Sequence, residues 1–341
     1  MGKLVLIVVT LAVMWSGWWL FASNALEQRV TKVVETRRAS GWQVEIGSRE
    51  RLGFPARLHT RLTGVTIAPP PAQRSQTGLT GSIAAPRIDI SALPYWPGYA
   101  TLSSPVLQFD VAAPGFQAAV EANDIVADLR LRPGLRGEIE SLSLNSDEWE
   151  FTSPITGKIG GQGIEIGAVQ QSRQLPIYDI KATFDEVSPD ASILSLLGLS
   201  EDWSQPLDIA TADLTLTFDR PWGRDAFGPV RPQPRVIDLH QAELAWKSIA
   251  ARASGTLNVA EDGVLTGTLS LEVDDWPTLL DMASTAGYLP SDFRPQAEQM
   301  LKGLSQMSGK TTGLDLTISI TDGQMAMGFI PLGHAPRIIL R

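Results

Sequence analysis

The chain contains no cysteine, and this absence excludes several kinds of chemistry. Without thiols there is no disulfide framework, no thiolate nucleophile and no cysteine-ligated metal or iron–sulfur site. Three histidines, His59, His240 and His334, stand far apart, and no two of them have the spacing of zinc ligands. We therefore expect no metal site and no cofactor, and we expect structural or solvent-exposed roles for the histidines.

The usual patterns of catalytic residues are also missing. No serine lies in a GxSxG nucleophile elbow, and no SxxK string occurs. Acidic pairs such as Asp147-Glu148 and Asp274-Asp275 fall where turns and helix caps are expected, and carboxylates are favoured there for local reasons. We predict a protein that is not an enzyme, and an unrecognised hydrolase is the enzymatic alternative.

Positive charge is scarce, with 28 Lys and Arg residues against 37 Asp and Glu residues and a formal net charge of −9. A nucleic-acid-binding protein needs a concentrated basic face, so we expect no nucleic-acid partner. Four basic residues follow the hydrophobic N-terminal segment closely: Arg29, Lys32, Arg37 and Arg38. We expect this basic stretch to lie on anionic lipid headgroups.

Charge is absent altogether from Leu4 to Ala22. As a helix this segment would be about 28 Å long, close to the roughly 30 Å of the bilayer's hydrocarbon core and longer than a signal-peptide core. We predict a retained transmembrane signal-anchor over residues 1–25, although Ser23 and Ala25 leave signal-peptide cleavage open as an alternative. Four aromatic residues near its end are predicted to lie at the membrane interface: Trp15, Trp18, Trp19 and Phe21.

The side of the membrane on which the body lies is less directly encoded. Only Lys3 precedes the span, whereas four basic residues follow it, so the positive-inside rule would keep the body in the cytoplasm. Long domains can translocate regardless of flanking charge. We predict a single-pass inner-membrane protein with its body in the periplasm, with the charge count against this orientation.

The hydrophobic periodicity changes from helical to alternating after residue 41. Helical spacing over residues 26–41 predicts a juxtamembrane helix that ends at Gly41, and alternation at 213–219, 265–273 and 314–320 predicts antiparallel strands with one apolar face. Turns are predicted at Pro97-Gly98, Asp262-Gly263 and Asp322-Gly323, and helices at 188–198, 274–287 and 291–307. The fold class is thus mainly β (α+β): an antiparallel, curved sheet or sandwich with a few packed helices after the transmembrane helix.

Composition also suggests how the body is divided. Residues 220–234 are rich in proline and glycine, which predicts a linker. We therefore expect a β-rich periplasmic region over residues 42–219 and a C-terminal hairpin and helix region over residues 235–341.

Both ends of the chain carry short strings that resemble one family. The anchor ends in WSGWW and is followed by GWQVE and GFPAR, while SGTLNVAEDGVLTGTLSLEVDDWPTLL and DGQMAMGFIPLGHAPRI lie near the C-terminus. These strings are similar to those of domain-of-unknown-function family 2125, with His334 where that family's tail has proline. The matching residues are structural: Gly53, Phe54, Pro55, Asp262, Gly263, Asp322, Gly323, Pro331, Leu332, Gly333 and Pro336.

The resemblance implies a membrane-anchored envelope protein of Gram-negative bacteria with no assigned activity. A looser likeness to AsmA-like envelope proteins implies a part in lipid transport or outer-membrane homeostasis, by analogy only. The apolar strand faces could form a closed core or line an open groove for acyl chains, and the sequence does not decide between them. We predict a lipid-binding or envelope-homeostasis role, and the alternative is a scaffold that binds another envelope protein through a sheet edge.

Overall fold

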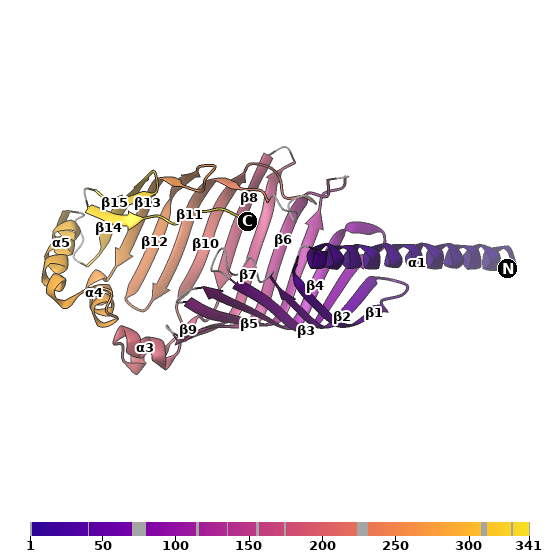
Figure 1. The fold of residues 1–341 in the computed structure, drawn as a ribbon, viewed down its shortest axis with the longest axis horizontal. Coiled ribbons are helices and arrows are strands. Elements are labelled where there is room, and N and C mark those ends of the chain that lie inside the picture. The colour runs from indigo at the N-terminus through magenta and orange to yellow at the C-terminus, as the bar shows by residue number, and fades with distance from the viewer. Residues whose placement is uncertain are drawn as a thin grey trace. The chain divides into compact units, whose positions relative to one another are not determined.

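The computed structural model (Figure 1) describes residues 2–39, 41–69, 80–113, 116–134, 136–154, 157–173, 175–223, 231–307, 312–328 and 330–340. These residues lie mostly in antiparallel strands, which confirms the mainly β fold class. The chain divides into two compact units, one of residues 1–130 and 151–155 and the other of residues 131–150 and 156–341. The division falls near residue 131, and the predicted linker at 220–234 lies within the second unit, in part outside the described residues.

The first unit combines a long helix with an antiparallel meander. Its elements are α1 (Gly2–Ala39), β1 (Gln43–Leu52), β2 (Leu58–Ala68), β3 (Thr80–Leu93), β4 (Trp96–Ala113) and β5 (Phe116–Leu131). Each strand pairs with the next along the chain. A buried cluster of Leu62, Val65, Ala85 and Ile88 forms its core. The predicted anchor and juxtamembrane helix are one continuous helix, and Gly41 follows its end with φ of 84°.

The N-terminal part of α1 extends past the strands of this unit (Figure 1). Among the described residues, no helix is both long enough and apolar enough to span a membrane. The side chains of residues 1–9, 11 and 12, on which the predicted transmembrane helix depends, lie outside the described residues. The signal-anchor over residues 1–25 is therefore not supported by the described residues and stays a prediction.

The second unit is an open antiparallel sheet whose strands follow one another in chain order. Its strands are β6 (Ile139–Ser153), β7 (Gly157–Ser172), β8 (Leu175–Phe184), β9 (Ser188–Pro189), β10 (Ile209–Phe218), β11 (Pro234–Trp246), β12 (Ile249–Val259), β13 (Leu265–Asp274), β14 (Leu314–Thr321), β15 (Gln324–Met327) and β16 (Ile330–His334). The end of β6, from Phe151 on, belongs to the first unit. The short β9 pairs with β7, away from the main order. The strands expected at 213–219, 265–273 and 314–320 are confirmed as parts of β10, β13 and β14.

Helices lie at one end of the strands of this unit (Figure 1). They are α3 (Ala191–Leu197), η1 (Glu201–Ser204), α4 (Trp276–Thr285), η3 (Ser291–Phe293) and α5 (Arg294–Met307). The side chain of Asp190 caps α3 by accepting from two backbone N–H groups, and Gly198 ends it at φ of 69°. Asp275 caps α4 in the same way, through the N–H of Thr278. The helices predicted at 274–287 and 291–307 are confirmed as α4 and as η3 with α5. The helix predicted over 188–198 is confirmed only from Ala191, because Ser188 and Pro189 form β9 and Asp190 is the cap.

Two glycines, one on β12 and one on β13, each lie close to the backbone of the other strand. Gly267 has φ of 156°, and a Cβ there would lie 2.1 Å from the carbonyl oxygen of Thr256. We expect Gly267→Ala to lower the free energy of unfolding by about 2 kcal/mol or more, because the clash adds to backbone strain. Gly167→Ala, in β7 where no atom lies within 4 Å of the new Cβ, is the matched control and should change it by less than about 1 kcal/mol. Denaturant titration of the full chain in detergent checks this, and equal effects would contradict it.

Candidate functional site

The second unit carries one continuous apolar face. Cross-strand pairing places Ile180 of β8 opposite Leu214 of β10, and Leu214 opposite Leu239 of β11. Leu239 in turn pairs with Gly255 of β12, which pairs with Leu269 of β13. Since paired residues point to the same side of a sheet, these side chains share one face.

The opposite face of the same strands is polar. Lys181 Nζ lies 3.1 Å from Asp213 Oδ2, and the hydroxyl of Thr215 donates to Asp179 Oδ1 at 2.7 Å. His240, predicted to have a structural or solvated role, is half-exposed on this side and contacts Asp213 Oδ1 at 3.1 Å. The strands thus separate an apolar side from a water-facing side, as the alternating sequence predicts.

Both ends of the apolar face are covered. Near one end, Leu194 of α3 and Met282 of α4 pack with Trp246 and Ile249 in a buried cluster. Near the other, Ala335 and Ile338 of the C-terminal tail pack against a second buried cluster, formed by Leu257, Val259, Leu265 and Ile320. Between these clusters the face is less covered: Ile180, Leu214 and Leu239 are only half-buried, and Leu244 is 42% exposed.

A hollow of about 380 Å³ lies in this middle part. That volume is within the range of small-molecule sites in proteins, roughly 300–1,000 Å³. Its lining residues are Phe184, Ala210, Thr211, Ala212, Ala242, Glu243, Leu244, Ala251, Ala253 and Leu271. The short alanine side chains leave space beneath the larger apolar ones. Glu243, the charged lining residue, is paired with Arg252 at 2.9 Å, so the lining offers no unpaired charge.

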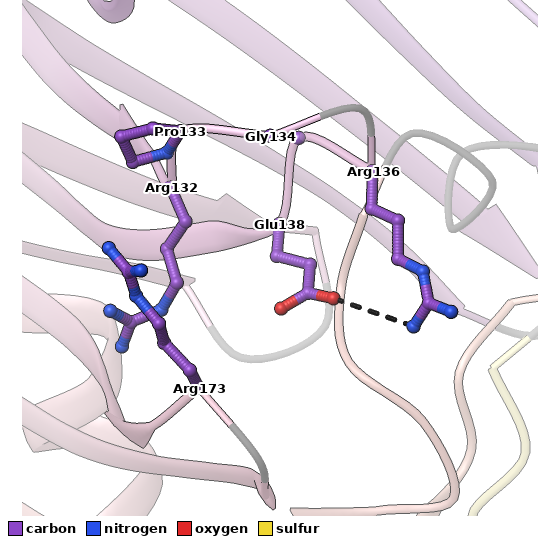
Figure 2. Close-up of a pocket in the computed structure, with 7 residues that line it drawn as sticks. Arg132, Pro133, Gly134, Arg136, Glu138 and Arg173 are labelled. Carbon is purple, nitrogen blue, oxygen red and sulfur yellow. Dashed lines mark ion pairs between the residues drawn. The ribbon is translucent and has the colours of Figure 1, made fainter.

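A smaller hollow of about 180 Å³ lies at the turn between β5 and β6 and is rich in arginine (Figure 2). Arg132 and Arg173 lie near each other on one side of it, and Arg136 and Glu138 on the other (Figure 2). Arg132 is largely buried and donates from Nε to Gln170 Oε1 at 2.6 Å. Since guanidinium groups bind carboxylates and phosphates well, this arginine pocket could hold an anionic group.

The arginine pocket borders the apolar face. Gln170 pairs with Tyr178, and Tyr178 pairs with Leu216, so all three share that face. The alanine-lined hollow sits farther along the same strands, at Phe184 of β8. Six residues separate Tyr178 from Phe184, which is about 20 Å in a strand.

In the first unit, the predicted interfacial tryptophans of α1 bind backbone carbonyls of two loops. Trp15 Nε1 donates to Pro55 O at 3.0 Å, and Trp19 Nε1 donates to Arg57 O at 2.9 Å. Trp18 Nε1 donates to Pro94 O at 3.2 Å. Trp19 is 7% exposed, so it is buried in the protein, whereas Trp18 and Phe21 are exposed. The GFPAR string is therefore a docking loop for α1.

The predicted basic stretch makes contacts of its own. The guanidinium of Arg37 lies over the ring of Trp42 at 5.4 Å, and Arg38 donates to Val44 O through Nε at 2.9 Å. Lys32 is exposed, and the side chain of Arg29 lies outside the described residues.

The two C-terminal sequence segments that resemble the family lie close together in the structure. The tail donates from Ala335 N to Gly323 O at 2.7 Å and from Ile338 N to Gly263 O at 3.0 Å. Gly263 and Gly323 both have positive φ, in the two predicted Asp-Gly turns that Asp262 and Asp322 begin. The tail residues Pro331, Leu332, Gly333 and Pro336 lie in or just after β16, and the exposed His334 ends that strand. These residues hold the tail over one end of the apolar face.

His59 contacts an ionic cluster on the polar face of the first unit. Its Nε2 lies 2.8 Å from Asp89 Oδ1, and Asp89 also accepts from Arg61 Nε at 2.8 Å and forms an ion pair with Arg87, whose Nε lies 3.0 Å from Oδ2. Burial opposes ionisation of Asp89, but the hydrogen bonds from Arg61 and His59 outweigh it, so its pKa is lowered from 3.8. The structural role predicted for His59 fits this arrangement.

A carboxyl whose pKa is lowered by folding stabilises the fold above its unfolded pKa and loses that contribution below it. We expect Asp89→Asn to lower the free energy of unfolding at pH 7. We expect the difference in this free energy between the variant and the natural protein to shrink as the pH falls below 3.8. Denaturant midpoints measured at pH 7 and pH 3 check this. A difference that stays constant with pH would contradict the assigned cause.

Sequence reasoning missed two parts of these sites. The turn predicted at Pro97-Gly98 is wrong: β4 runs through it, and the turn lies at Pro94 and Tyr95, between the paired Leu93 and Trp96. The alanine-lined hollow was also missed, because alanine gives no signal until strand pairing brings several together. Alanine recurs at alternate positions within two strands, at 210 and 212 and again at 251 and 253, and together with Ala242 this recurrence is the sequence trace of the hollow.

The comparisons with known proteins agree with the resemblance noted at the two ends of the chain. No curated protein matches the chain. The family described as "Uncharacterized protein conserved in bacteria (DUF2125)" matches residues 19–336, which is most of the sequence. The chain therefore belongs to the DUF2125 family.

Proposed function

We propose that this protein is a membrane-tethered, non-enzymatic envelope protein whose second unit holds lipid acyl chains on its open apolar face. The observation that carries the proposal is the alanine-lined hollow in the part of that face that neither the helices nor the tail covers. Burial of apolar surface is worth about 0.8 kcal/mol per methylene, so a 16-carbon chain offers on the order of 10 kcal/mol of gross transfer free energy. No specific catalytic motif is needed for such binding.

The arginine pocket supports the choice of a lipid over a purely apolar ligand. Arg173 offers a cationic group to a phosphate at the border of the same face, beside Arg132, which is ion-paired with Glu140 at 3.3 Å. The roughly 20 Å of strand between Tyr178 and Phe184 is close to the length of an extended acyl chain of a membrane lipid. A lipid with an anionic headgroup at the arginines would place its chain toward the alanine-lined hollow.

The uncharged segment of α1 from Leu4 to Ala22 supports attachment to the inner membrane, with the body in the periplasm as the proposed location. The looser likeness to AsmA-like envelope proteins agrees with this role but belongs to the proposal. The scaffold alternative receives less support from the edge strands. β1 carries several charged side chains, and β16 is short and contains Pro331, features with which proteins block strand addition.

A native mass spectrum of the full-length protein, extracted gently from its own membranes, tests the proposal. We expect a polypeptide mass that includes residues 1–25, with bound phospholipid that survives detergent exchange. A bare polypeptide would contradict lipid binding, and a mass that indicates cleavage after Ala25 would contradict the anchor.

A further inference from the structure

Two loops at one end of the first unit expose large aromatic side chains. Phe54, in the loop between β1 and β2, is 58% exposed, and Tyr95, in the turn between β3 and β4, is 66% exposed. Trp96, the first residue of β4, is 46% exposed. Turn positions usually hold polar or small residues, so three large aromatic side chains there call for a partner.

Both loops lie at the same end of the strands. Leu58, which begins β2, pairs with Ala92 near the end of β3, so the loops that adjoin these residues are neighbours. Figure 1 shows the strand ends of β1 to β4 beside α1. The two loops therefore present their aromatic side chains from one edge of the unit.

Hydrogen bonds from α1 hold both loops beside residues 15–19 of the helix. Trp15 and Trp19 donate to carbonyls of the loop between β1 and β2, and Trp18 donates to Pro94 O of the other loop. The ring of Trp19 also packs edge-on against that of Phe54, with centroids 5.2 Å apart. The exposed loop rings thus stand at the level of helix residues 15–21, where the uncharged segment ends.

The geometry points to a bilayer surface as the partner of this aromatic rim, which we define as Phe54, Tyr95 and Trp96 together with Trp18 and Phe21 of α1. The ring centroids of Phe21 and Trp18 lie 5.9 Å apart on α1, and the Trp19 ring beside them packs against Phe54 of the loop, so helix and loop rings lie close together. Aromatic side chains are enriched at membrane–water interfaces. The loop residues 53–56 and 94–96 carry no charge, so their insertion desolvates no ionised side chain.

This inference rests on the proposed tether and extends it, because it assigns membrane contact to the folded body. Loops and helix would then enter the headgroup region together, and the strands of the first unit would begin at the membrane surface. A protein partner for the rim is the competing occupant. The rim's continuity with an uncharged helical segment of bilayer length favours lipid.

The absence of cysteine makes single-site labelling direct. We would make Ala56→Cys and Tyr95→Cys in the full chain, attach an environment-sensitive fluorophore, and reconstitute each protein into phosphatidylethanolamine–phosphatidylglycerol vesicles with quencher-bearing lipids. Thr66→Cys is the control: it is exposed on β2, about 26 Å along the strand from Leu58. We expect a blue shift and strong lipid quenching at Tyr95 and at Ala56, which adjoins the rim, and neither at Thr66.

Vesicle flotation separates this inference from the tether itself. Protein that floats with the vesicles while its rim labels behave like the Thr66 label would overturn the rim inference and leave the tether standing. Protein that does not float would overturn both. Rim labels that are quenched on protein that floats support the inference, whereas a photoreactive amino acid at Tyr95 that cross-links in cells to another protein and not to lipid would overturn it. Lipid binding by the second unit is read out separately, by native mass spectrometry.

Discussion

Leu244→Glu is expected to remove most of the lipid that co-purifies with the protein. Leu244 lines the alanine-lined hollow and is 42% exposed, so the new carboxylate can stay hydrated in the lipid-free fold. A bound acyl chain would bury that carboxylate without a partner, which costs several kcal/mol. Since 1.4 kcal/mol corresponds to a factor of ten, we expect bound lipid to fall at least about tenfold. Native mass spectrometry of the full-length variant measures the lipid-bound fraction.

Two further variants make this test specific. Ser270→Glu adds the same charge on the polar face of β13, where Ser270 pairs with Ser254, and it should leave lipid binding unchanged. Ala212→Phe fills the hollow without adding charge and should also reduce binding, because the larger ring occupies the space of an acyl chain. Equal lipid binding by the Leu244 and Ser270 variants would contradict the assignment of the site.

Trp19→Ala is expected to release α1 from the first unit. The indole is buried, donates to Arg57 O and packs against Phe54, and removal of a buried tryptophan costs about 3–5 kcal/mol. The loop of residues 53–57 should lose order with the helix, because Trp19 holds both the carbonyl of Arg57 and the ring of Phe54 in that loop. Hydrogen exchange of the full chain in detergent should show faster exchange in this loop and in the second half of α1.

Phe21→Ala is the control for that change. Phe21 lies on the same helix, is 66% exposed and contacts Trp18, so its removal should alter exchange in the loop only slightly. If the Trp19 variant kept the exchange rates of the natural protein, the loop would not depend on the helix. The tryptophans would then have to be explained by the membrane alone.

The parts of the fold that are predictable from sequence are those with local causes. Asp190 and Gly198 bound α3, and Asp262-Gly263 closes the hairpin of β12 and β13, because caps and tight turns depend on a few adjacent residues. The period-two segments become strands with one apolar face for the same reason. Fold class, helix ends and the C-terminal hairpin follow from such signals.

The candidate site could not be predicted, because it depends on strand register. The alanines of β10, β11 and β12 share one face because Ala212 pairs with Ala242 and Ala242 with Ala253, and a register shift between Asp213 and Leu214 brings Leu239 onto the same face. Whether an apolar face is covered depends on where helices and the tail pack, which no periodicity encodes. The turn at Tyr95 was not predicted, because Pro97-Gly98 is a stronger turn signal in the sequence. The pairing of Leu93 with Trp96 places the turn earlier in the chain.

The buried environment of Trp19 could not be predicted from the sequence either. An aromatic cluster at the end of an uncharged segment is typical of a membrane interface, and the sequence gives no sign that one member is buried against the protein. The partner is the carbonyl of Arg57, which any residue type could supply. Backbone acceptors leave no trace in a sequence, so contacts to them become visible only in the fold.

The most direct test of the central claim is photo-crosslinking in growing cells. A photoreactive amino acid at Leu244, on the apolar face, is compared with the same group at Ser270, on the polar face, and the cross-linked adducts are identified by mass spectrometry. We predict phospholipid adducts at Leu244 and none at Ser270. Adducts to a protein alone at Leu244, or equal lipid labelling at both positions, would contradict the claim that this face holds acyl chains.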